Sequence, residues 1–115
     1  MSNVLPKEIV DEVRAVLEKA ATGKSPTTKY LTAYQILDRL PRDRYDQLVN
    51  QRGRGGKGEG VYYAATSVVA KAAEMVCNDS NGDIDYIDTG GLKVEIKDQC
   101  VEPSYEVCGL YRLPA

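Results

Sequence analysis

The spacing of hydrophobic residues changes along the chain, at Asn81-Gly82. Before this point apolar side chains recur every three or four residues, which predicts helices, and after it they alternate with polar ones, which predicts strands. We expect the first helix over residues 6–22, where it begins at a proline and is ended by Gly23. Residues 29–31 are expected to form one short strand.

Two helices are predicted to follow this strand directly. Thr32 and Gln35 have the spacing of a capping box, so a helix should begin there and end at Pro41. The inward-facing residues of this helix are Ala33, Ile36, Leu37 and Leu40. The next helix is expected over residues 41–51, since proline is accepted at a first helical position. The residues that it should bury are Tyr45, Leu48 and Val49.

A glycine-rich segment, residues 52–60, separates the third predicted helix from the fourth. It has five glycines in nine positions and no apolar side chain, so we expect a flexible basic loop. The fourth helix, residues 66–77 with Thr66 as its cap, is apolar around most of its circumference. It should therefore be the best-buried helix. Its expected core residues are Val68, Val69, Ala72 and Val76.

The C-terminal third is predicted to form β-structure. Alternation favours a hairpin over residues 83–98, with residues 88–91 as its turn, and a last strand over residues 105–113. The hairpin residues expected to pack on the fourth helix are Ile84, Tyr86, Leu92, Val94 and Ile96. These elements predict an α+β fold in one domain, residues 1–115, with four helices packed on a small three-stranded antiparallel sheet.

The order of these elements resembles that of winged helix-turn-helix domains. Residues 31–37 (LTAYQIL) look like the entry to the second helix of such domains, and are also similar to short uncharacterised bacterial proteins. The resemblance implies nucleic-acid binding, with residues 83–98 as the wing. The chain departs from the pattern in its turn, because about 25 residues separate Leu40 from Thr66, where three or four are usual.

Charge is distributed unevenly along the chain. Residues 39–57 hold six bases against two acids, whereas residues 72–106 hold two bases against nine acids. This asymmetry indicates contact with a charged partner. The acidic hairpin would oppose a polyanion, so it favours a protein partner over a nucleic acid.

The residue composition excludes several kinds of active site. The chain has no histidine, which rules out Ser-His-Asp and Cys-His catalysis and imidazole metal ligation. Its cysteines, at positions 77, 100 and 108, lack C-x-x-C spacing, so we expect three reduced, small apolar residues. No export signal begins the sequence, and no segment approaches the ~18 apolar residues of a membrane span. We therefore expect a cytoplasmic, soluble protein with no membrane partner.

Three motifs resemble functional sites but lack the context that those sites require. Residues 53–58 match G-x-G-x-x-G by letter, but no strand precedes them, so they do not predict a nucleotide site. Residues 79–88 carry oxygen ligands at the spacing of a calcium loop. When Gly82 is aligned with the invariant glycine of such loops, however, the first ligand position falls on Cys77. Asp83 and Asp85 alternate with apolar residues, which indicates a solvated face rather than a catalytic carboxylate pair. We therefore predict no catalytic, cofactor-binding or metal-binding residues, and no enzyme activity.

The function favoured by the sequence is that of a macromolecule-binding module. We expect a protein partner or another copy of the chain, with a winged-helix-like nucleic-acid-binding regulator as the alternative. The candidate contact residues lie on the polar face of helix 41–51 and in the basic loop. They are Arg42, Arg44, Gln47, Asn50, Arg52, Arg54 and Lys57.

Overall fold

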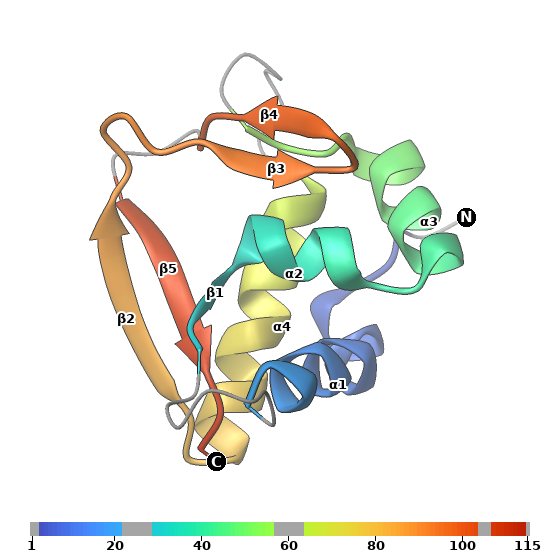
Figure 1. Cartoon of the computed structure of the whole chain (residues 1–115). Helices are drawn as coiled ribbons and strands as arrows, with labels where there is room; N and C mark the ends of the chain where they lie inside the picture. Colours follow the sequence, from blue (N-terminus) through green and yellow to red (C-terminus); the bar gives the residue numbers. More distant parts are fainter. Residues whose placement is uncertain (1–2, 22–28, 57–63, 104–106, 115) are drawn as a thin grey trace.

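The computed structural model describes residues 3–21, 29–56, 64–103 and 107–114 (Figure 1). In chain order the elements are a 3-10 turn η1 (Pro6–Glu8), α1 (Val10–Ala21), β1 (Leu31–Thr32), α2 (Ala33–Arg39), α3 (Arg42–Arg52), α4 (Ala65–Asp79), β2 (Asp83–Asp88), β3 (Val94–Ile96), β4 (Gln99–Val101) and β5 (Val107–Arg112). The predicted α+β class, with four helices and a small antiparallel sheet, is confirmed.

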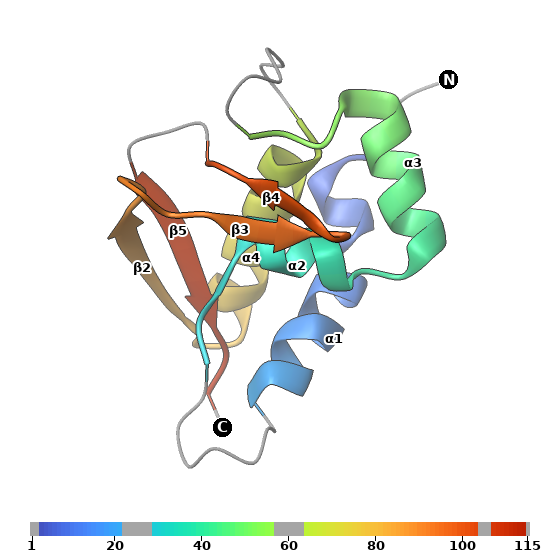
Figure 2. The same ribbon diagram turned by 45° about the horizontal axis from the view of Figure 1, so that its top comes forward.

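The strands form two separate sheets. The first has three antiparallel strands in the order β1-β5-β2, and it flanks the helices on one side of the molecule (Figure 1). The second is the hairpin β3-β4, which crosses the ends of α2 and α4, as the turned view shows (Figure 2). Within the three-stranded sheet, β5 is central and β2 is an edge strand.

The predicted hairpin over residues 83–98 is wrong. β2 pairs along its whole length with β5, from Asp83 opposite Arg112 to Asp88 opposite Val107. β3 pairs instead with β4, through a turn whose residues Lys97 and Asp98 have φ of 48° and 66°. The physical reason is packing, because Val94 and Ile96 of β3 are buried against α2 and cannot also lie beside β2. The wing that the resemblance implied is therefore not formed.

The N-terminal helices begin close to the capping residues and prolines that the sequence indicates. The Thr32 hydroxyl accepts from the Gln35 N–H at 3.2 Å, and the Gln35 side chain accepts from the Thr32 N–H at 2.8 Å. The predicted capping box is thus confirmed. The third helix begins one residue after Pro41, which serves as its N-cap. The first predicted helix divides at Ile9 into η1 and α1.

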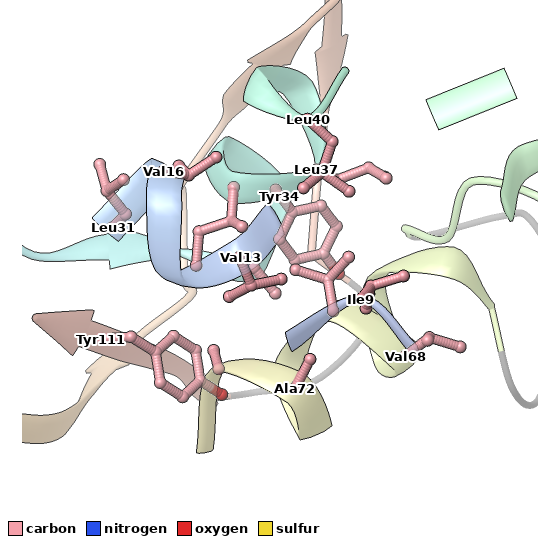
Figure 3. Packing of buried hydrophobic residues seen from close by; sticks show 14 of the residues in the cluster. Ile9, Val13, Val16, Leu31, Tyr34, Leu37, Leu40, Val68, Ala72 and Tyr111 are labelled. Carbon is pink, nitrogen blue, oxygen red and sulfur yellow. The ribbon is translucent and has the colours of Figure 1, made fainter. Parts of the chain in front are cut away.

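The core is centred on α4, as the sequence predicted. Val68, Val69, Ala72 and Val76 are all fully buried. Side chains from α1, α2, α4 and β5 meet in one cluster, in which Tyr111 of β5 lies against α4 (Figure 3).

One expected core residue of the sheet is on the surface instead. Tyr86 is 65% exposed, because β2 is the edge strand and its outer half extends beyond the helices. Ile84, which lies opposite Tyr111 where all three strands run side by side, is partly buried against the core.

The fourth helix does not begin at Thr66, contrary to expectation. It begins at Ala65, with Ala64 as its N-cap. Two N–H groups of its first turn, those of Ala65 and Thr66, donate to the carbonyls of Gly53 and Arg54 at 2.8 and 3.2 Å. The glycine-rich segment therefore supplies the acceptors that a capping side chain would otherwise provide.

No helix within the described ranges is long and apolar enough to cross a membrane.

Candidate functional site

Arg44, one of the predicted contact residues, joins two helices of the fold. Its guanidinium donates twice to the carboxylate of Glu12 on α1, at 2.8 and 3.0 Å, and once to Gln47 at 2.8 Å. The hydrogen bond with Glu12 raises the pKa of Arg44 further above its ordinary value. A bidentate, charge-assisted pair of this kind fixes geometry as well as charge. Arg44 therefore braces α3 against α1.

Two more predicted arginines hold segments of backbone together. Arg52, at the end of α3, donates to the carbonyl of Val4 at 3.0 Å. Arg54 donates to the Gly55 carbonyl at 3.3 Å and to the side chain of Gln99 on β4. Both side chains are partly buried. These contacts tie the N-terminal segment and the second sheet to the end of α3.

The remaining predicted residues lie apart from these contacts. Arg42, Gln47 and Asn50 are exposed along α3, which agrees with the polar face expected there. The guanidinium of Arg42 lies 3.2 Å from the Asp46 carboxylate, and 5.6 Å from the ring centre of Tyr45. Lys57 lies outside the described residues. The outer face of α3 is therefore polar and of mixed charge. The other two arginines of α3, Arg44 and Arg52, make contacts within the fold.

A polar cluster that the sequence did not reveal joins the second sheet to the helices. Asp38, at the end of α2, accepts from the Lys97 N–H at 2.9 Å, and its carbonyl accepts from the Lys97 ammonium at 2.7 Å. The same ammonium lies 5.0 Å from the ring centre of Tyr45 on α3. Because Lys97 occupies the β3–β4 turn, this cluster fixes the hairpin in place. Its partners are 59 residues apart in the chain, so no local pattern indicates it.

Strand β2 carries the most exposed acidic surface of the sheet. Three of its six residues are exposed aspartates: Asp83, Asp85 and Asp88. Asp83 is paired with Arg112 of β5 at 2.7 Å, and Asp85 accepts from the Tyr86 N–H at 2.8 Å. Asp88 accepts from the Gly90 N–H at 2.8 Å. The carboxylates are therefore oriented by their neighbours, but all three remain open to solvent.

Apolar side chains are exposed beside these acids. Tyr86 is 65% exposed, Ile87 38% and Val107 58%. Val107 lies across the strand pair from Asp88, so the three residues belong to one end of the β2–β5 ladder. Single exposed apolar residues are common, but a group beside a sheet edge is typical of a contact surface. Sequence alternation missed this group because it placed Tyr86 in the core.

The cysteines are free thiols, and they differ in environment. Cys77 and Cys108 are buried, as expected of small apolar residues, whereas Cys100 on β4 is exposed, so that expectation was wrong for Cys100. Burial raises the pKa of both the Cys77 and the Cys108 thiol, which keeps them protonated and unreactive at neutral pH. The part of the chain that the structure describes holds no cluster of cysteine, aspartate and glutamate side chains suited to a metal ion.

Comparison with known proteins adds no relative: no family model, curated protein or solved structure matches this chain.

Proposed function

We propose that the chain is a non-enzymatic protein-binding module whose contact surface is the acidic edge of its three-stranded sheet. The observation that carries this proposal is the surface of β2, where exposed aspartates flank the exposed Tyr86 and Ile87. Aromatic and aliphatic side chains supply the apolar area of a protein contact, and charged neighbours select and orient the partner.

The charge of this surface indicates what kind of protein it suits. Among the residues that the structure describes, Asp85 and Asp88 have no cationic partner, whereas Asp83 is balanced by Arg112. A cationic partner gains from these carboxylates, while a nucleic acid is repelled by them. A second copy docked through the same strand would bring acids against acids, which is unfavourable. The partner that fits is therefore a different, basic protein.

Nucleic-acid binding through α3 and the basic loop remains the alternative function. It has less support because Arg44 and Arg52 are engaged with Glu12 and with the Val4 carbonyl. On the outer face of α3, Asp43 and Asp46 lie beside the exposed Arg42, so phosphates would meet both signs of charge.

The two functions are separated by binding measurements at low salt with labelled probes. The protein-binding proposal predicts that the native chain binds an unstructured lysine-rich peptide, and binds neither duplex DNA nor single-stranded RNA. The double variant Asp85→Asn/Asp88→Asn should weaken peptide binding. The control variant Glu18→Gln/Glu95→Gln makes the same charge change on exposed positions away from β2 and should leave binding unchanged.

Salt-sensitive binding to either nucleic acid would overturn the proposal, since each phosphate contact releases counterions. In that case Arg42→Ala/Lys57→Ala should weaken the binding and flatten its salt dependence. Equal peptide binding by the β2 variant and the control variant would also contradict the proposal.

A further inference from the structure

We infer that the partner binds as an extended basic segment that adds a strand to the free edge of β2. This inference rests on the proposed function and names the partner's shape and chemistry. It follows from three features of β2: its unpaired edge, the different character of its two faces, and the position of its carboxylates.

The first feature is the edge itself. β2 has six residues paired with β5 on one side, and no described strand lies along its other side. Half of the backbone N–H and C=O groups of an edge strand point away from its neighbour, ready to pair with another chain. Six residues match the usual length of a strand, so the edge is long enough to hold an added segment in register.

The second feature is that the two faces of β2 differ. Successive side chains of a strand point to opposite faces, and the ladder with β5 runs without a bulge. Over residues 83–86, Ile84 and Tyr86 share the face of the buried Tyr111, while Asp83 and Asp85 share the opposite face. At the far end of the strand the pattern reverses, because Asp88 shares the face of Tyr86 and Ile87 shares the face of Asp85. Along residues 83–86, an added strand would place its side chains alternately beside apolar side chains and beside carboxylates.

The third feature is the position of Asp85 at the edge. Its carboxylate accepts from the N–H of the next residue, Tyr86, at 2.8 Å. In the free protein this contact places a negative charge at the strand, which discourages pairing with a second acidic β2. An incoming strand would replace this contact: its backbone would take up the Tyr86 N–H, and the released carboxylate would contact a lysine or arginine of that strand. Asp85 thus selects against the protein's own copy and in favour of a basic segment.

The ligand that these features define is an extended peptide in which lysine or arginine alternates with β-branched or aromatic residues. The basic residues contact the outer face with Asp85, and the apolar residues contact Tyr86. Main-chain hydrogen bonds to β2 supply affinity, and the alternation supplies specificity, as in other cases of strand addition.

The test uses three synthetic peptides against the full chain, with binding followed by fluorescence anisotropy. The first alternates lysine and valine. The second has the same composition with all lysines at one end. The third is the alternating peptide with N-methyl groups on the amides of one edge. We expect the first peptide to bind most tightly. The N-methylated peptide should bind at least roughly tenfold more weakly, because several main-chain hydrogen bonds are lost.

Two substitutions locate the site. Asp85→Asn keeps the oxygen that accepts from Tyr86 but removes the charge, and should weaken binding of the alternating peptide roughly two- to fivefold. Tyr86→Ser should weaken it as well, by removing exposed apolar area. Glu95→Gln makes the same charge change on β3 and should have no effect.

The outcomes separate this inference from the proposed function. Equal binding of the alternating and N-methylated peptides would overturn strand addition, while leaving an acidic protein-binding surface intact. Binding that depends on lysine content alone, with the grouped peptide as good as the alternating one, would also overturn it. Binding of nucleic acid and of no peptide would overturn both.

Discussion

Gly109, in the central strand β5, is a position where the structure predicts a clear effect of a single added methyl group. A Cβ at this position would lie 2.8 Å from Cζ of Tyr111 and 3.2 Å from its Cε2. Both distances are below ordinary van der Waals contact. The tyrosine ring lies along the strand and covers the glycine, so only a residue without a side chain fits beneath it.

The ring has little room to move away. Tyr111 is 4% exposed, and its neighbours across the ladders are Leu31 of β1 and Ile84 of β2. The φ of Gly109 is not in the left-handed region, so Gly109→Ala adds a steric clash without backbone strain. Overpacking of this kind costs about 1–3 kcal/mol of the free energy of unfolding. Urea denaturation of the variant should show this loss with an unchanged slope.

A double-mutant cycle tests the cause of the loss. Tyr111→Leu removes the ring and has its own cost, but in that background Gly109→Ala should cost less than about 0.5 kcal/mol. Gly91→Ala serves as a control, because Gly91 has φ of 77° with open space around it, so its cost should not depend on residue 111. The same cost for Gly109→Ala in both backgrounds would refute the packing argument.

Three further predictions concern the core, the second sheet and the cysteines. Val69→Asp should destabilise the chain by several kcal/mol, because it buries an unpaired charge in α4, and unchanged thermal stability would contradict the assigned core. Asp38→Ala should cost about 1–2 kcal/mol, because the Lys97 N–H loses its acceptor, and Asp38→Asn should cost less in the same denaturation assay. Iodoacetamide should alkylate Cys100 of the native chain rapidly and the two buried thiols only on unfolding, as mass spectrometry would show; equal rates at all three would contradict their assigned burial.

The helical half of the fold could be predicted because its determinants are local. The capping box of Thr32 and Gln35 lies within four residues, and Pro41 separates two helices by its own geometry. The apolar circumference of residues 66–77 was enough to identify the central helix. Local signals of this kind are present in the sequence whatever the rest of the chain does.

The strand pairing could not be predicted in the same way. Alternation identified β-structure after residue 82, but pairing depends on which apolar face covers which helix. The true hairpin turn consists of Lys97 and Asp98, which adopt left-handed φ without a glycine, and it is fixed by Asp38 from α2. Residues 88–91, rich in glycine, resembled a hairpin turn but lead from one sheet to the other.

The binding surface proposed from the structure differs from the contact residues predicted from the sequence. The charge asymmetry of the sequence marks residues 72–106 as acidic, and the proposed surface lies there, whereas the predicted contact residues were the basic ones of α3 and the loop. Several of those arginines hold the fold together, which only long-range contacts reveal. The roles of the seven predicted residues in binding stay a prediction.

The most direct test of the account is amide hydrogen exchange, followed by NMR, with and without the alternating lysine–valine peptide. If a strand is added, exchange should slow along β2, from Asp83 to Asp88, because outward N–H groups gain partners in the added strand. Amides of α3 should exchange at unchanged rates. Slowing confined to α3, or no change along β2 at saturating peptide, would contradict the claim that the sheet edge is the binding surface.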